Sequence, residues 1–425
     1  MRAELISIGT ELAAGITVDT NAAWLAGRLA EVGIPAVRHV TVADDRAEVA
    51  AELRRAAGGA ELVVVTGGLG PTEDDLTRPA LADALGVGLR TSSTALEQVR
   101  AYFLRAGRKW HESNARQAEF PEGTTPIENR WGTAPGIRAV VGASIVYCLP
   151  GVPREMAEMF AAAVLPEIER RVVGGGDGGG HGLGSGGVIL TRTLRCFGAG
   201  ESNIGEQIAD LMQPGRAVSV GTTAQEGMIG VRFTARAASR AEADALIEAD
   251  MNEARRRLGV LVFGADDQTL ESVVGALLVD RGLTLSTAES CTGGLLAKRL
   301  TDVPGSSAFF VRGAVTYSNA SKTEVLGVDA GLIEEHGAVS AEVAEAMAVG
   351  CREQAGTDFA LSTTGIAGPS GGSAEKPVGL VYIALADSAG CRVRRFTFGE
   401  YLPRPSIRDR ACSTALNLLR TRLRD

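Results

Sequence analysis

Residues 288–300 read AESCTGGLLAKRL and join a polar turn to the start of a helix. An apolar run, Leu283–Leu285, leads into the turn ESCTGG at 289–294, and a helix-like pattern follows at 295–300. Glycine lets a ligand approach the backbone closely, and the unpaired N–H groups of a helix start attract anions. The segment therefore predicts a strand, a ligand-binding turn and a helix in direct succession.

The turn holds more polar residues than helix capping needs. One cap residue would satisfy a helix start. Here Ser290 and Thr292 stand together in the turn, and Tyr317, Ser318 and Lys322 follow downstream. We therefore favour a functional turn over a purely structural cap.

Length and charge limit the possible classes of protein. A chain of 425 residues is too long for one ordinary core, so two or three domains are expected. The net charge of −8 argues against binding nucleic acid by general attraction to its phosphates. The 4% content of aromatic residues argues against binding single strands by base stacking. Direct nucleic-acid binding is therefore not expected.

Cysteine and histidine usage argues against a zinc site. The six cysteines form no CxxC pair, and the four histidines form no HxxxH pattern. With no signal peptide recognisable at the start, free thiols in a reducing cytoplasm are expected. No apolar run approaches the roughly 20 residues of a membrane span.

The segment 1–173 alternates strand-like and helix-like patterns, which indicates a layered α/β domain. The wholly apolar run Leu62–Val65 is typical of a central parallel strand. Ligands collect outside the carboxyl ends of such strands. The expected strands are Glu4–Ile8, Ala36–Val42 and Leu62–Val65, and the expected helices are Asn21–Val32 and Arg46–Ala57.

Three further segments follow. Residues 174–187 are glycine-rich and predict a flexible insert. Residues 188–265 predict a small α+β domain that ends in the long helix Arg240–Leu258. Residues 268–425 predict a second α/β domain, which contains the ESCTGG turn.

A second polar cluster follows the strand Leu62–Val65 and reads TGGLGPTEDD at 66–75. Its glycines permit close approach of a phosphate, and the carboxylates of Asp74 and Asp75 suit Mg²⁺. It is not a Walker A loop, because the Gly-Lys-Ser/Thr ending is missing. An acid-rich helix start without a ligand is the alternative.

The motifs together resemble the CinA family of competence/damage-inducible proteins over nearly the whole chain. In the C-terminal half the matching motifs are ESCTGG, PGSS at 304–307, TYSNASK at 316–322, TTGIAGPSGG at 363–372 and EKPVGLVYIA at 375–384. In the N-terminal half they are GTEL, VDTNAAWLA, TGGLGPTEDDLT, NRWGTAPG at 129–136 and LPGVPREM at 149–156.

This resemblance implies a MoaB/MogA-like N-terminal domain, a KH-like middle domain and a C-terminal nicotinamide-nucleotide amidase domain. It implies a bifunctional enzyme of pyridine-nucleotide salvage, which deamidates nicotinamide mononucleotide and splits ADP-ribose with a divalent metal such as Mg²⁺. No cofactor is expected for the amidase domain. A cytoplasmic homodimer is also implied.

Deamidation requires a nucleophile, a base and an oxyanion stabiliser. Ser290 is the candidate nucleophile and Lys322 the candidate base, since no histidine lies in these motifs. Tyr317 is expected to relay a proton or orient the lysine. The remaining expected roles are an oxyanion hole from the N–H groups around Thr292, Gly293 and Gly294, and ribose or phosphate contacts from Thr364, Gly365 and Gly368.

Arg408 is expected to pair with the 5′-phosphate of the substrate in preference to Arg404. The family usually has a short Gly-Asp-Arg turn before the last helix, whereas residues 399–408 are longer and broken by proline. In the N-terminal domain the resemblance places Thr66, Gly67, Gly68 and Gly70 along the phosphates and has Asp74 and Asp75 facing the metal or phosphate.

Two other functions stay open. The chain could be an amidase whose N-terminal domain only senses a nucleotide. It could also be a non-enzymatic partner protein in competence or DNA damage.

Overall fold

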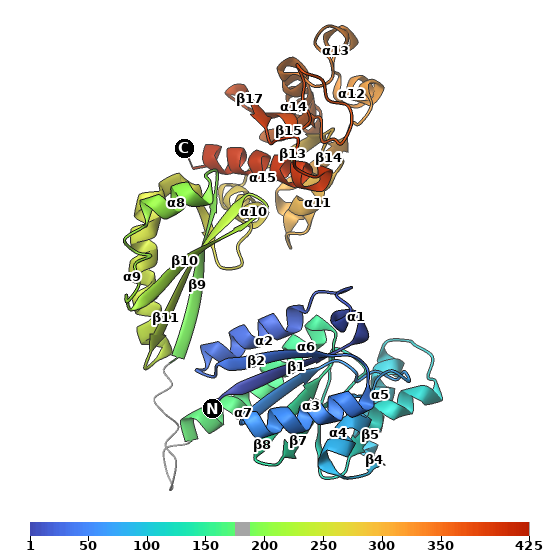
Figure 1. The fold of residues 1–425 in the computed structure, drawn as a ribbon. Coiled ribbons are helices and arrows are strands. Elements are labelled where there is room, and N and C mark those ends of the chain that lie inside the picture. Colours follow the sequence, from blue (N-terminus) through green and yellow to red (C-terminus); the bar gives the residue numbers. More distant parts are fainter. Residues whose placement is uncertain (175–187, 425) are drawn as a thin grey trace. The chain divides into compact units, whose positions relative to one another are not determined.

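The computed structural model describes residues 1–174 and 188–424 and divides into two compact units (Figure 1). The first unit contains Met1–Leu190 with Ala235–Ala245, and the second contains Thr191–Thr234 with Leu246–Asp425. The predicted glycine-rich insert lies outside the described residues, except for Gly174.

A six-stranded sheet with the order β2-β1-β3-β8-β7-β6 forms the centre of the first unit. The four strands β2, β1, β3 and β8 pair in parallel, and β7 and β6 continue the sheet antiparallel. All five residues of β3 are buried, as its apolar run predicted. The strands are β1 (Ala3–Ile8), β2 (Ala36–Val42), β3 (Leu62–Thr66), β6 (Thr125–Ile127), β7 (Gly136–Val141) and β8 (Ser144–Leu149).

Helices cover both faces of this sheet, so alternate residues of each strand belong to different cores. Val63 and Val65 pack with Leu53 of α3. Leu62 and Val64 pack instead with α2 and α6. The helices are α1 (Thr10–Ala13), α2 (Thr20–Glu31), α3 (Arg46–Gly59), α4 (Thr77–Leu85), α5 (Ser93–Arg105), α6 (Pro153–Met159) and α7 (Leu165–Gly174), and β4 (Leu89–Thr91) pairs with β5 (Glu119–Pro121).

The middle segment forms a four-stranded sheet with the order β10-β11-β9-β12. Its elements are β9 (Val188–Phe197), α8 (Glu201–Gln207), β10 (Val218–Gln225), β11 (Met228–Ala237), α9 (Arg240–Leu258) and β12 (Val262–Ala265). The long helix has the predicted bounds.

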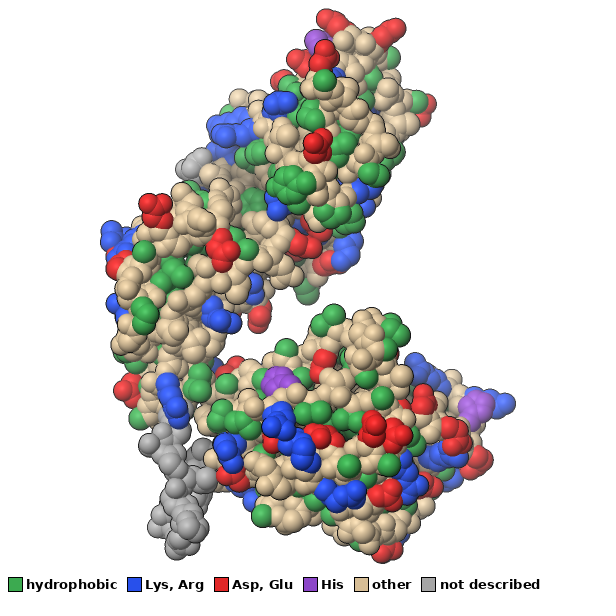
Figure 2. Space-filling model, viewed as in Figure 1, with side chains coloured by type: hydrophobic (Ala, Val, Ile, Leu, Met, Phe, Trp, Pro, Cys, Tyr) green, Lys and Arg blue, Asp and Glu red, His purple; other side chains and the backbone are tan. Residues whose placement is uncertain are grey.

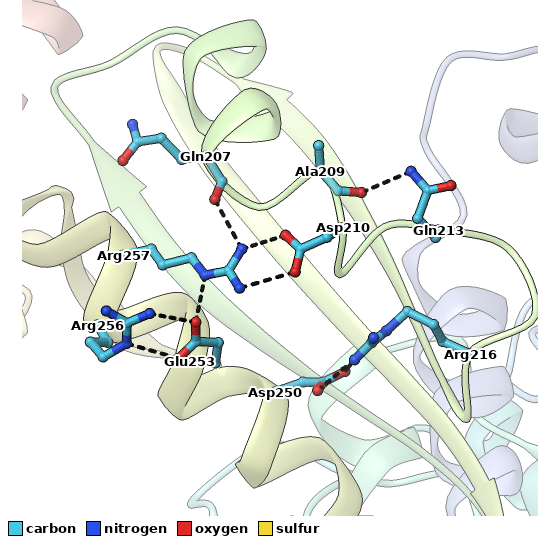
Figure 3. A network of polar contacts seen from close by, with 9 residues as sticks. All are labelled: Gln207, Ala209, Asp210, Gln213, Arg216, Asp250, Glu253, Arg256 and Arg257. Atoms are coloured by element: carbon cyan, nitrogen blue, oxygen red, sulfur yellow. Dashed lines mark hydrogen bonds and ion pairs between the residues drawn. The ribbon is translucent and has the colours of Figure 1, made fainter.

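The arginine run at the end of α9 is paired with carboxylates rather than free to attract phosphate. Arg257 contacts both Asp210 and Glu253, and Arg256 donates two hydrogen bonds to Glu253 (Figure 3). Arg255 pairs with a third acid on the same helix. On the face shown in Figure 2, acidic and basic side chains are interspersed rather than gathered into a basic stripe.

The C-terminal segment forms a mixed sheet with the order β14-β13-β15-β16-β17. The central strand β13 pairs in parallel with β14 and β15, and β16 and β17 add antiparallel strands. The strands are β13 (Leu285–Glu289), β14 (Phe310–Val315), β15 (Phe359–Gly365), β16 (Leu380–Asp387) and β17 (Gly390–Thr397). The helices are α10 (Leu270–Arg281), α11 (Leu295–Thr301), α12 (Asn319–Leu326), α13 (Ala330–His336), α14 (Ala341–Ala355) and α15 (Arg404–Arg422).

The small sheet and the C-terminal sheet share one apolar core in the second unit. Phe197 and Phe263 of the small sheet join a cluster that contains Leu416 and Leu419 of α15. The Arg420 guanidinium donates to the carbonyl of Val260 at 2.5 Å. The last helix therefore packs against both sheets.

All six cysteines are free thiols, as expected. None of the described helices is both long and apolar enough to cross a membrane.

Candidate active sites

The ESCTGG turn leaves the carboxyl end of β13, between the ends of its two parallel neighbours. The backbone N–H of Ser290 donates to the carbonyl of Thr363 on β15 at 2.9 Å. The N–H of Thr316, just after β14, donates to the carbonyl of Glu289 at 2.8 Å. Three strands therefore fix the position from which the Ser290 side chain projects.

The structure brings Ser290 and Lys322 together, as the sequence analysis expected. Lys322 lies on α12, and its Nζ donates to Ser290 Oγ at 3.2 Å and to the carbonyl of Thr316 at 2.9 Å. Only 1% of Lys322 is exposed. This burial lowers the pKa of its ammonium group, because the charged form loses its hydration. A lysine that is held in this way can accept a proton from the serine hydroxyl.

Glu289 is a second buried residue of the site, and the sequence analysis did not assign it a role. Its carboxylate is fully buried and accepts the N–H groups of Leu296 at 3.0 Å and Ala297 at 2.8 Å. It thereby satisfies the first turn of α11, which has no cap from Gly294. The available signal was an acid at the end of a strand, directly before the glycine turn.

Three backbone N–H groups in the turn were expected to stabilise an oxyanion, and one of them already donates a hydrogen bond within the turn. The N–H of Gly293 donates to the carbonyl of Ser290 at 3.1 Å, so this group is already engaged. Within the described residues, the N–H groups of Thr292 and Gly294 have no acceptor. Gly294 has a φ of 89°, a left-handed conformation that favours glycine.

The Tyr317 hydroxyl does not reach Lys322. The ring is 58% exposed, and its hydroxyl accepts from Arg404 Nη2 at 2.9 Å. Only the main-chain carbonyl of Tyr317 contacts Lys322 Nζ, at 3.3 Å. Tyr317 therefore orients the lysine through its backbone, and the expected hydroxyl relay is not what the geometry shows.

The two arginines near the start of α15 make different contacts within the protein. Arg408 donates from Nη2 to the carbonyl of Thr292 at 2.6 Å and from Nε at 3.1 Å, so it holds the turn. Arg404 is exposed beside Tyr317 and keeps donors available for an anion. Arg404 is therefore the more accessible of the two for the expected phosphate contact.

Three residues that were predicted to contact a ligand, at the end of β15 and in the loop after it, make contacts within the protein. The buried Thr364 hydroxyl donates to the carbonyl of Ala338 at 2.6 Å. A Cβ on Gly365 would lie 2.6 Å from the carbonyl oxygen of Leu380. The Gly368 carbonyl accepts from Arg404 at 2.8 Å. In the structure these three residues shape the loop and anchor Arg404.

Cys291 does not compete with the neighbouring serine as a nucleophile. Burial raises the pKa of its thiol to about 12, which leaves very little reactive thiolate at neutral pH.

A second candidate site is a cavity of about 450 Å³ at the carboxyl ends of β1, β3 and β8. The four predicted phosphate-contacting residues Thr66, Gly67, Gly68 and Gly70 all line it. Gly67 has a φ of 100°, and a Cβ there would lie 2.1 Å from the carbonyl oxygen of Ile8. Only glycine fits this position beside the cavity.

The two predicted metal ligands differ in how many hydrogen bonds their carboxylates already accept. Asp75 accepts the N–H of Gly70 at 2.7 Å and of Thr72 at 2.8 Å, so its carboxylate braces the loop. Asp74 and Asp75 both line the cavity, and the Thr72 hydroxyl also donates to Asp75, which leaves Asp74 the less engaged of the two carboxylates. No group of three or more metal-ligating side chains is found among the described residues. One free carboxylate still suits Mg²⁺ held mainly by ligand phosphates.

Two buried amides that the sequence analysis did not assign also line this cavity. Asn21 donates from Nδ2 to the carbonyl of Gly151 at 2.8 Å, and Gln117 donates from Nε2 to the hydroxyl of Thr133 at 3.0 Å. Within the described part of the chain, neither amide oxygen has a donor. A ligand that brings hydroxyl or amine donors would satisfy both oxygens. No local sequence signal marks Gln117.

Arg78 adds a buried positive charge beneath the glycine loop. Its guanidinium donates to the carbonyl of Leu69 at 2.7 Å and of Gly70 at 3.2 Å. Burial lowers its pKa to about 10, so it stays charged at neutral pH.

Comparisons with known proteins cover all three segments. Family models match residues 4–170 as a probable molybdopterin binding domain, 191–264 as the KH domain of damage-inducible protein CinA and 267–423 as the CinA C-terminal domain. A CinA-like protein of Geobacter sulfurreducens is 44% identical over 100% of this chain and 99% of its own. A CinA-like protein of Frankia casuarinae is 45% identical over 100% of this chain and 96% of its own. A crystal structure of a competence/damage inducible protein from Agrobacterium tumefaciens is 41% identical and covers 37% of this chain and 98% of that one, with a TM-score of 0.35.

Proposed function

Because the chain belongs to the CinA family, we propose that its C-terminal segment hydrolyses the amide of nicotinamide mononucleotide. The observation that supports this most directly is the buried Lys322 Nζ at 3.2 Å from Ser290 Oγ. A serine activated by a lysine is an established alternative to a Ser-His-Asp triad in amide hydrolysis.

The reaction follows from these groups. Neutral Lys322 takes the proton of Ser290 Oγ, which attacks the amide carbon and forms a tetrahedral intermediate. The free N–H groups of Thr292 and Gly294 stabilise its oxyanion. The protonated lysine then gives its proton to the departing nitrogen, and ammonia leaves. Water hydrolyses the resulting ester with the same lysine as base, which yields the carboxylate and restores Ser290.

The positive charge of Arg404 near the turn supports a substrate that carries a phosphate. Arg404 is exposed, and the Gly368 carbonyl and the Tyr317 hydroxyl hold its guanidinium in place. A guanidinium held in this way suits the phosphate of a mononucleotide. Arg408 contributes indirectly by holding the turn that carries the oxyanion donors.

We propose that the N-terminal cavity cleaves ADP-ribose between its two phosphates. The N–H groups of the glycine loop and the charge of Arg78 would hold the phosphates, and Asn21 and Gln117 would accept from ribose hydroxyls. Asp74 would hold a divalent metal, which neutralises phosphate charge when bound. In one alternative, this cavity binds the nucleotide without cleaving it.

The test uses the full chain with nicotinamide mononucleotide and with ADP-ribose, each with and without Mg²⁺. Release of ammonia and release of AMP are measured separately. Ser290→Ala should stop the first and spare the second, and Asp74→Asn should do the reverse. No ammonia release by the unmodified chain would refute the amidase. Binding of ADP-ribose without release of AMP would establish the sensing alternative.

A further inference from the structure

The second unit contains a cavity of about 510 Å³ that is separate from the Ser290 turn. Its lining comes from the loop after β9, the hairpin between β10 and β11, the end of β17 and the helix α15. Cavities of this size suit small organic ligands.

Arg410 of α15 faces this cavity with an unused guanidinium. Its Nε is shielded from solvent and has no hydrogen-bond partner within the described residues. A Cβ on Gly227, in the β10–β11 hairpin, would lie 3.6 Å from this Nε, so the hairpin covers the group. The other four arginines of α15 all donate to an oxygen of the protein, and they are Arg404, Arg408, Arg420 and Arg422.

An unpaired buried donor on a permanent cation needs a partner. Since the described part of the chain supplies none, an anionic group from outside would satisfy it. A carboxylate matches the planar guanidinium in geometry. The hydroxyl of Thr414, one helical turn further along α15, also lines the cavity and offers a further donor.

The other lining residues indicate the shape and charge of the rest of the ligand. Phe197, Ile229 and Phe398 line the cavity with apolar surface, two of them as flat rings. The carboxylates of Glu201 and Glu226 also line it and belong to exposed residues. They oppose a doubly charged phosphate ester more than a singly charged acid.

We propose that this cavity binds a small aromatic monocarboxylate, with its ring between the apolar walls and its carboxylate on Arg410. This site is distinct from both proposed active sites. It does not depend on either proposed activity.

The test titrates the full chain with benzoate and with the neutral isostere benzamide, and follows binding by ligand-observed NMR. Benzoate should bind at least tenfold more tightly than benzamide. Phenyl phosphate should bind more weakly than benzoate. In Arg410→Gln the affinity for benzoate should fall to that for benzamide, and Arg410→Lys should recover part of it.

The matched control is Arg395→Gln, which removes an exposed arginine of β17 and should leave benzoate binding unchanged. Circular dichroism and the melting temperature confirm that each variant is folded. Should Arg410→Gln fail to fold, the benzoate–benzamide ratio and Arg410→Lys still decide. Equal affinities for acid and amide, tighter binding of phenyl phosphate, or benzoate affinity unchanged in a folded Arg410→Gln variant would each overturn the proposal.

Discussion

Replacing Lys322 separates its role as a base from a role as a fixed charge. Lys322→Met removes the amine and keeps an unbranched apolar side chain in the buried site. Lys322→Arg keeps the positive charge but cannot accept a proton at any accessible pH. If Nζ deprotonates Ser290 across the observed 3.2 Å contact, both variants should be inactive to a similar degree.

The expected magnitude follows from general-base catalysis, which contributes about 100- to 10,000-fold. That loss in kcat/KM corresponds to about 3 to 5 kcal/mol of transition-state stabilisation. Ammonia release from nicotinamide mononucleotide measures it, and the melting temperature checks that both variants fold.

The pH profile of the unmodified chain tests the same reasoning. Burial lowers the pKa of Lys322, and only the neutral amine accepts a proton. The value of kcat/KM should therefore fall as the pH is lowered through that pKa, with a limb below the ordinary lysine value of about 10.4. An arginine variant that keeps activity within about tenfold of the unmodified chain would refute the Ser-Lys mechanism.

Three further substitutions test the other assignments. Ser290→Ala should abolish ammonia release without changing the melting temperature, and residual activity within about tenfold would leave Ser290 as a structural residue. Asp75→Asn should destabilise the first unit by about 1 to 3 kcal/mol, because it weakens the acceptor for two loop N–H groups, whereas Asp74→Asn should spare stability and reduce metal-dependent cleavage of ADP-ribose. Equal effects of these two changes on unfolding would contradict the division of roles. Glu289→Gln should lower stability by about 1 to 3 kcal/mol and reduce amidase activity, because one of the two helix N–H groups loses its acceptor; calorimetry that shows no loss would remove Glu289 from the site.

Local sequence determined much of the fold. The helix α9 has the predicted bounds, and glycine ends other helices where local sequence places a stop. Gly282 and Gly356, for example, end α10 and α14 in the left-handed conformation. The buried strand β3 was equally clear from its apolar run. The resemblance to the CinA family likewise rested on short sequence motifs that occur in the same order.

Tertiary structure alone decided which polar groups remain free. Arg408 meets the Thr292 carbonyl across 116 residues of chain, and Thr364 meets the Ala338 carbonyl across 26. No local pattern reports such partners, because a hydrogen bond depends on where the folded chain places both atoms. Asp75 and Asp74 also look alike in sequence, but the folded conformation of their loop engages Asp75 with the N–H groups of Gly70 and Thr72. The sequence named the residue types of both sites, and packing determined which of them could meet a ligand.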